Sequence, residues 1–458
     1  MLNSVNDFLW SYIVVLALAV CALYFTFRLH FVQFRLLRDM IWLLFHPDKK
    51  DDSRRKHISS FQAFAVALAS RIGTGNIAGV ATAISVGGPG AVFWMWVMAL
   101  LGSATSFVES TLAQLYKRKA KDAFIGGPAY YMKYGLNKAW MGVIFSILMI
   151  LTFSFANNSV QSNTICAAWE KAFGFNATGM GIVLTVFTLS VIFGGIHRVA
   201  KVSSVVVPVM AIAYLILSAG ILLWNIKLIP HVLTLIIKSA LGLDQAAGGM
   251  LGITIMQGVK RGLFSNEAGE GSTPNAAATA YVTHPVKQGL IQALGVFTDT
   301  LLVCSCTAFI ILLSGVDIHA TNGVQLTQDA LTHEIGSLGN PFIAITILLF
   351  AFSTIIGNYY YGEANIRFIT KSPLPLFLFR LTVGAMVLLG SVITLDLAWS
   401  LTDLCMIFLT LCNLIAIVPL SRHVVFLLYD YVRQRRNGEI PTFRKEQMPD
   451  IADKLESW

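Results

Sequence analysis

Charged residues are scarce in this sequence. Asp, Glu, Lys and Arg make up 12% of its 458 residues, about half the share of an average soluble domain. Hydrophobic residues make up 56%, and the mean hydropathy is +0.69. These values exclude a soluble globular fold and predict an all-α polytopic membrane protein. Apolar runs of about 20 residues predict eleven transmembrane helices, at roughly 8–28, 60–86, 90–115, 140–166, 178–196, 202–224, 246–281, 287–314, 341–363, 375–395 and 400–420.

Catalytic and metal-binding motifs are also missing. The six cysteines lie in or at the ends of apolar runs without paired His or Cys ligands, so neither a disulfide framework nor a metal site is expected. The sequence has no His-Glu-x-x-His, no Gly-x-Ser-x-Gly and no nucleotide-binding loop. We therefore expect no enzyme, no ATP-driven pump and no cofactor. A channel is the alternative function from a different class of protein, although the sequence has no selectivity-filter motif and no residues that would form a ring of charge.

The net charge of +9 is explained by where the basic residues lie. With the N-terminus outside, 27 of the 33 Lys and Arg residues fall in predicted cytoplasmic segments, and the predicted external segment 316–340 has none. By the positive-inside rule this predicts a multi-pass plasma (inner) membrane protein with a cytoplasmic C-terminus. The net positive charge is therefore explained by membrane topology and does not indicate nucleic-acid binding. The first 27 residues contain Asp7 but no Lys or Arg, so the first helix is expected to be an uncleaved span.

The chain divides into four predicted parts. Residues 1–57 form the N-terminal helix and a cytoplasmic segment whose apolar residues recur at helical spacing, as in a helix lying in the membrane interface; a solvated linker is the alternative. Residues 58–225 and 226–420 hold five helices each, and the second set adds an external run at 231–240 that is too short to span. Residues 421–458 form a basic cytoplasmic tail, expected to be partly disordered.

A repeated pattern interrupts the first helix of each set of five. It reads Arg71-x4-Asn76-x-Ala78-Gly79 in one set and Arg261-x4-Asn266-x-Ala268-Gly269 in the other. Broken helix at membrane depth is tolerated only where protein or a cavity surrounds it, and paired breaks point to a transporter's binding site. Five is odd, so the two sets have opposite orientation, which is typical of the 5+5 inverted repeat of the leucine-transporter fold with one extra N-terminal helix. Glycines that merely allow close packing are the alternative.

The first break, from Ser70 to Asn76, can serve an anion and a cation together. Its glycines let the chain leave helical geometry. The freed N–H groups at the following helix start attract a carboxylate. The freed carbonyl groups near Ala69 and Ile72 are candidate cation ligands.

The second break is predicted to run from Gly262 to Pro274 and contains Glu267 and Glu270. A carboxylate centred in lipid costs at least about 2.5 kcal/mol, so both must face a cavity or a partner. The available partners are Arg71, Lys260 and Arg261. Two roles are open for Glu267, Arg71 and Arg261: they form a gate or coupling site, or they form a fixed structural salt bridge. Glu270 is expected at the cytoplasmic mouth with an electrostatic role.

Three long strings carry a resemblance to a known family. They are Gly73 to Ala81, Gly87 to Trp96 and Phe264 to Gly269. They resemble the hallmark segments of the alanine or glycine:cation symporter family, also called the sodium:alanine symporter family, and the match extends over essentially the whole chain. The resemblance implies symport of a small neutral amino acid, alanine or glycine first, with Na⁺. Proton coupling through Glu267 or Glu363 is the alternative within the same fold, and the oligomeric state is left open.

The resemblance also implies roles for individual residues. Thr74 and Gly75 would offer N–H groups to the substrate carboxylate, and Gln161 would point a polar group at it. Phe264 would border the ammonium and side-chain end. The full substrate set implied is Gly73, Thr74, Gly75, Gln161, Phe264, Ser265, Gly269 and Asn358. The cation set implied is Ala69, Ile72, Asn76, Ser353 and Thr354, with Na⁺ as the cation.

The sequence departs from the commoner family pattern at two positions. Asn358 stands where many members have a tryptophan, so the size and polarity of the side-chain pocket are expected to differ. The alternative is that Asn358 hydrogen-bonds a neighbouring helix. Glu270 stands where an apolar or amide residue is usual, which bears on the inner gate.

Overall fold

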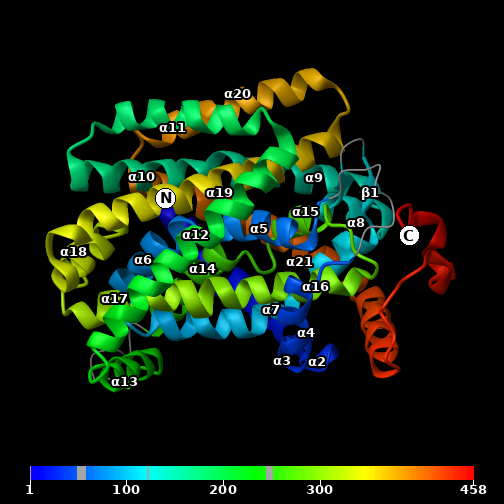
Figure 1. Cartoon of the computed structure of the whole chain (residues 1–458), viewed down its shortest axis with the longest axis horizontal. Helices are drawn as coiled ribbons and strands as arrows, with labels where there is room; N and C mark the ends of the chain where they lie inside the picture. Colours follow the sequence, from blue (N-terminus) through cyan, green and yellow to red (C-terminus); the bar gives the residue numbers. More distant parts are fainter. Residues whose placement is uncertain (1, 49–57, 121–122, 244–250) are drawn as a thin grey trace.

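The structure is a computed structural model that describes residues 2–48, 58–120, 123–243 and 251–458. It is almost entirely helical (Figure 1). The described strands are β1 (Arg118–Lys119) and β2 (Phe124–Ile125), which pair antiparallel. An all-α membrane fold is therefore confirmed.

The N-terminal part is one long span followed by two short helices. The span consists of α1 (Leu2–Leu9), a π-helical turn η1 (Trp10–Val14) and α2 (Val15–Arg28). Phe31, in the left-handed conformation, ends it and redirects the chain into α3 (Val32–Arg35) and α4 (Leu37–Phe45). The amphipathic helix predicted here is thus present, while residues 49–57 of the same predicted segment lie outside the described residues.

The first set of five begins with the first broken helix. A capping box between Ser59 and Gln62 starts α5 (Ser60–Arg71), and after Ile72 the chain continues in η2 (Gly75–Gly79) and α6 (Val80–Gly87), bent by 47°. The other members are α7 (Ala91–Leu115), α8 (Pro128–Tyr134), α9 (Ala139–Met149), η3 (Ile150–Asn157), α10 (Asn158–Phe173), α11 (Ala177–Ile192) and α12 (Gly195–Trp224).

The second set begins with the second broken helix, α14 (Leu251–Asn266) followed by α15 (Thr273–Ala277). Before it, α13 (Ile229–Ala240) is the short helix predicted at 231–240. The other members are α16 (Pro285–Val296), η4 (Phe297–Cys304), α17 (Ser305–Ser314), α18 (Val324–Ile335), η5 (Gly336–Leu338), α19 (Gly339–Ile369), α20 (Pro373–Gly390) and α21 (Leu395–Arg436).

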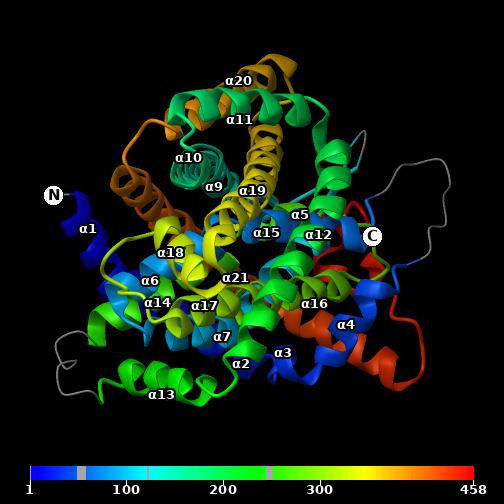
Figure 2. The same ribbon diagram turned by 60° about the vertical axis from the view of Figure 1, so that its left-hand side comes forward.

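The broken helices lie between two groups of longer helices. In Figures 1 and 2, α10, α11, α19 and α20 form one group, and α7, α14 and α16 form the other. Between them runs α5, which packs against α12, α19 and α16. Beyond the second break, Ala280 forms an isolated parallel bridge with Ile58, just before α5. The two broken helices are therefore joined at this end.

Eight described helices are long and apolar enough to cross a membrane, or nine if the bent pair at residues 60–87 is one span. Helix is present in each of the eleven predicted segments, but α11 has only 16 residues and α14 is interrupted. The count of eleven thus stays a prediction.

Two sequence expectations are wrong. The second break begins at Glu267, because α14 stays helical through Asn266. Its apolar residues Leu263 and Phe264 pack in the core. The tail is not disordered either. Helix α21 continues to Arg436, and the chain then folds back through η6 (Lys445–Gln447) and η7 (Pro449–Lys454). Contacts with residues far away in sequence order it: Trp458 Nε1 donates to the carbonyl groups of Gln114 and Leu115.

Candidate substrate and cation site

The first break is held open by side-chain amides. Asn76 Oδ1 accepts a hydrogen bond from Gly73 N (2.9 Å), which ties the break to the helix that follows it. Gln161 on α10 accepts from Thr74 N at 2.9 Å, while its own Nε2 donates to Asn157. The predicted residues Gly73, Thr74 and Gln161 are thus brought together, and an amide oxygen bonds the N–H group of Thr74.

The hydroxyl group of Thr354 meets the carbonyl groups on the other side of this break. Thr354 Oγ1 on α19 lies 2.9 Å from Ala69 O and 3.3 Å from Ile72 O, and 3.1 Å from Phe350 O in its own helix. Ser353 Oγ instead donates to Phe350 O, with Met210 Sδ 3.9 Å away. The structure therefore brings oxygen atoms of Ala69, Ile72 and Thr354 together, and it does not bring the Ser353 hydroxyl to them. Their role in binding a cation stays a prediction.

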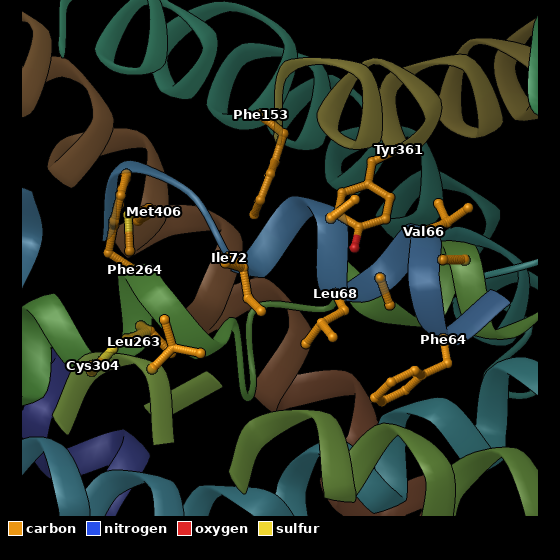
Figure 3. Packing of buried hydrophobic residues seen from close by; sticks show 14 of the residues in the cluster. Phe64, Val66, Leu68, Ile72, Phe153, Leu263, Phe264, Cys304, Tyr361 and Met406 are labelled. Carbon is orange, nitrogen blue, oxygen red and sulfur yellow. The ribbon is translucent and has the colours of Figure 1, made fainter. Parts of the chain in front are cut away.

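The last turn of α14 packs against the first break. A Cβ atom added at Gly75 would lie 3.0 Å from the Phe264 ring and 3.0 Å from Ser265 Cα. Figure 3 shows Phe264 beside the segment that follows Ile72. The Phe264 ring makes an edge contact with Trp399 of α21, with centroids 4.6 Å apart. A side chain at position 75 would therefore crowd Phe264 and Ser265.

Asp299 belongs to the same cluster, although it was not among the predicted residues. This fully buried carboxylate on η4 accepts from Asn76 Nδ2 (2.6 Å), Ser265 Oγ (2.7 Å) and Thr300 Oγ1 (2.9 Å). Asn76 therefore bonds both the first break and Asp299, and it does not lie among the carbonyl ligands of Thr354. The sequence signal was available: an acidic residue inside an apolar run is a functional-site candidate.

Glu267 lies in a ring of hydroxyl groups. Its carboxylate accepts from Ser70 Oγ (2.5 Å) on α5, Ser272 Oγ (2.6 Å) and Thr273 Oγ1 (3.2 Å) beyond the break, and Tyr361 OH (3.3 Å) on α19. Figure 3 shows the Tyr361 hydroxyl pointing toward α5. Glu267 thus connects both breaks with α19, and hydroxyl donors take the place expected for a cationic partner.

The cationic residues expected beside Glu267 are paired elsewhere. Lys260 Nζ and Arg261 Nη2 both contact Asp403 Oδ2 on α21, at 2.6 and 2.9 Å, and Arg261 also stacks over Trp399. Arg71 donates to Gln292 O and Ser106 Oγ. The expectation that Lys260 and Arg261 pair with the break carboxylates is therefore wrong. The carboxylate that neutralises them comes from α21, where Asp403 also stands alone in an apolar run.

Asn358 is engaged on both sides by neighbouring helices. Its Nδ2 donates to Asn158 Oδ1 on α10 (3.0 Å), and its Oδ1 lies 2.6 Å from Ser70 Oγ on α5. Of the two alternatives for this residue, the geometry favours hydrogen bonding to neighbouring helices.

Gly269 and Glu270 lie away from the first break. Gly269 N donates to Glu109 Oε1 (3.3 Å) on α7, and Gly269 O accepts from Asn413 on α21. Gly269 therefore contacts α7 and α21 and does not join the predicted substrate residues around Gly73. Glu270 is 1% exposed, so its side chain is shielded from water in this structure, and its predicted place at the cytoplasmic mouth stays a prediction.

These features define a class of protein: a membrane transporter with two facing broken helices, of the leucine-transporter fold. A solved structure, MhsT in complex with L-phenylalanine, shares this fold with a TM-score of 0.53 over 88% of this chain and 93% of that chain, at 14% identity.

Sequence comparison identifies the particular family. The profile of the sodium:alanine symporter family matches residues 1–445. The "Probable sodium/glutamine symporter GlnT" of Bacillus subtilis is 51% identical over 99% of this chain and 94% of its own. The "Putative sodium/proton-dependent alanine carrier protein YrbD" of the same organism is 44% identical over 96% and 94%. The chain belongs to the sodium:alanine symporter family; it is a secondary active amino-acid symporter and not an enzyme.

Proposed function

We propose that this protein takes up a small neutral amino acid, alanine or glycine first, together with Na⁺. The observation that carries the proposal is the position of Thr354 Oγ1 between Ala69 O and Ile72 O. Carbonyl and hydroxyl oxygens are the hard ligands that Na⁺ requires. The Thr74 N–H group lies two residues beyond Ile72, so one break serves the cation on one side and the carboxylate on the other.

In this proposal the substrate carboxylate replaces the Gln161 oxygen at Thr74 N. Gln161 then turns its amide so that the Nε2 group donates to the same carboxylate, which a Gln side chain allows by rotation about its last torsion. The positive end of the helix that starts at Gly75 adds a favourable electrostatic contribution. Phe264 and Ser265 bound the far side of the site at close range, which favours a short side chain.

The Na⁺ gradient supplies the driving force. We propose an external N-terminus and a cytoplasmic C-terminus, so that Na⁺ moves inward and gains about 2.3 kcal/mol per 100 mV of membrane potential. The helix sets at 58–225 and 226–420 would move relative to each other around the two breaks. Arg71 ends α5 at the first break and Glu267 begins the second break, so both would respond to this movement.

Glutamine is the second candidate substrate, because the relative that is 51% identical over 99% of this chain is described as a probable glutamine symporter. The experiment is uptake of labelled alanine, glycine, serine and glutamine into proteoliposomes with an inward Na⁺ gradient or an equal choline gradient. We expect concentrative uptake of alanine and glycine that requires Na⁺. Uptake that is equal in choline would contradict sodium coupling, and flux that never exceeds equilibrium would favour a channel.

A further inference from the structure

A second group of titratable residues lies beyond the substrate site, where the second break meets α7. Glu109 on α7 is 0% exposed, and Glu267 and Glu270 in the break are each 1% exposed. The charges that act on Glu270 are those of Glu267, Glu109 and Arg71. Three carboxyl groups thus act on one another in a region shielded from water.

Glu109 has hydrogen-bond donors on both of its carboxyl oxygens. Gly269 N donates to its Oε1 at 3.3 Å, and Asn413 Nδ2 donates to its Oε2 at 2.9 Å. Asn413 is fixed in this orientation because its Oδ1 accepts from Tyr131 OH. A carboxylate that accepts several N–H bonds is stabilised in its charged form. Glu267 likewise accepts hydrogen bonds, from four hydroxyl groups.

Glu270 has the opposite surroundings. Its Oε1 is buried and has no hydrogen-bond partner among the described residues. No described N–H or O–H group is directed at this carboxyl oxygen, whereas two carboxylates and only one cation act on it. Carboxyl groups that share a site do not all ionise, and the proton stays on the one that is least solvated by donors.

We propose that Glu270 is a proton-binding site, and that its proton is released and rebound as the second break opens and closes during transport. The inference rests on the proposed symport function and adds a co-transported proton, bound from the outside and released to the inside. In the closed conformation seen here, Glu270 is a neutral carboxyl group. When the segment opens, water reaches the side chain, the O–H bond breaks, and the proton leaves as H₃O⁺ while the carboxylate keeps the electron pair.

The backbone around Glu270 is built for such a movement. Gly269 and Gly271 on either side have φ values of +104° and +79°, and Glu267 has φ of +57°. Glycine adopts this left-handed conformation at low cost, so the segment can change direction at Gly269 and Gly271. Arg71 belongs to the first break, so a proton at Glu270 changes the charge balance across both breaks. Two tyrosine hydroxyl groups also belong to this region: Tyr361 OH donates to Glu267, and Tyr131 OH donates to Asn413.

The test uses the full-length protein in liposomes that contain a pH-sensitive dye, with the membrane potential clamped by K⁺ and valinomycin. Alanine is added with Na⁺ at equal concentration on both sides, and internal pH is recorded. We expect alanine-dependent acidification in the wild type, and a loss of about tenfold or more in Glu270→Gln. The matched control is Glu170→Gln, which removes an exposed carboxyl group on α10 and should leave the signal unchanged.

Sodium-dependent alanine counterflow separates this inference from the proposed function. If counterflow fails in the wild type, the proposed function is wrong. If counterflow is normal but the wild type shows no alanine-dependent acidification, or if Glu270→Gln acidifies like the wild type, the proton site is wrong. Infrared spectroscopy of the wild type gives a second readout that does not need the variant to transport. A protonated carboxyl C=O band that disappears in Glu270→Gln supports the assignment, and a band that persists unchanged overturns it.

Discussion

Thr354 Oγ1 lies 2.9 Å from Ala69 O, so a hydroxyl group on α19 touches a carbonyl group freed where α5 breaks. The adjacent Ser353 hydroxyl bonds within its own helix instead. Two neighbouring hydroxyl groups of similar chemistry are thus separated by geometry, and this gives a matched pair of variants for the cation site.

Thr354→Ala should raise the Na⁺ concentration for half-maximal alanine uptake by about tenfold, equivalent to about 1.4 kcal/mol. The reason is loss of one oxygen ligand from the set that includes Ala69 O and Ile72 O. Ser353→Ala is the control. It should change the Na⁺ concentration for half-maximal uptake by less than about threefold, because the Ser353 hydroxyl bonds to Phe350 O. The measurement is initial uptake rate against Na⁺ at saturating alanine. Equal sodium dependence in both variants would remove Thr354 from the cation site.

Gly75→Val should abolish alanine binding in a folded protein. A Cβ atom at this position would lie 3.0 Å from both the Phe264 ring and Ser265 Cα, and a branched side chain would keep the carboxylate from the backbone N–H groups. Gly79→Ala is the control, since a Cβ there would have its nearest neighbour at 3.8 Å. Calorimetric titration with alanine and Na⁺ measures the outcome; undiminished binding by Gly75→Val would refute the carboxylate assignment.

The breaks were predictable because they depend on local chemistry. Close helix packing explains glycines in an apolar run but not the Arg71 and Asn76 beside them, and the structure bends the helix there by 47°. The end of α14 was not predictable by the same argument. Gly262 lies in the predicted break, yet its neighbours Leu263 and Phe264 keep the helix intact by packing in the core, a tertiary effect that outweighs local preference.

Partners from distant segments were the least predictable. Asp299 and Asp403 each stand in an apolar run, which marks them as candidates, but only the folded chain brings Asp299 to Asn76 and Asp403 to Arg261. The order of the tail has the same cause, because its contacts lie more than 300 residues away in sequence. The charged composition of the tail predicts a solvated segment, whereas the contacts of Trp458 with α7 order it.

Asp403→Asn should destabilise the protein by about 3–5 kcal/mol, because it leaves two buried cations, Lys260 and Arg261, without a carboxylate. Lys260→Met should cost less, since Arg261 still neutralises Asp403. The measurement is the melting temperature of the purified protein in detergent. An unchanged melting temperature for Asp403→Asn would show that this charge cluster does not support the fold.

Asn358→Ala should leave substrate selectivity unchanged and lower stability by about 1–3 kcal/mol. The amide bonds Asn158 on one side and contacts Ser70 on the other, so its removal leaves buried polar groups without partners. Competition by alanine, serine and glutamine against labelled alanine tests selectivity, with thermal unfolding as the stability readout. An altered inhibition profile would place Asn358 at the substrate side chain, in agreement with the other sequence-based alternative.

The contact between Lys117 and Trp458 should make docking of the tail dependent on pH. Lys117 Nζ donates to Gln114 Oε1 (2.8 Å) and Ala280 O (3.1 Å), and it lies 4.7 Å from the centre of the Trp458 ring. Burial lowers the pKa of Lys117 from 10.5 to about 7. Undocking of Trp458 lets water reach the ammonium group and returns the pKa toward its ordinary value. The docked state therefore binds fewer protons between these two pKa values, so docking strengthens as pH rises from about 7.

Trypsin cleavage after Lys454 measures this docking, because Lys454 O is held by Arg118 in the docked tail. In the wild type we expect cleavage, corrected for trypsin activity on a free peptide, to slow as pH rises from 7 to about 9. Lys117→Met removes the titrating group and should make cleavage independent of pH. Trp458→Ala should give fast cleavage throughout, since it removes the ring that covers Lys117 and the bonds to Gln114 and Leu115. Protection that rises in parallel in the wild type and Lys117→Met would mean that another group controls the tail.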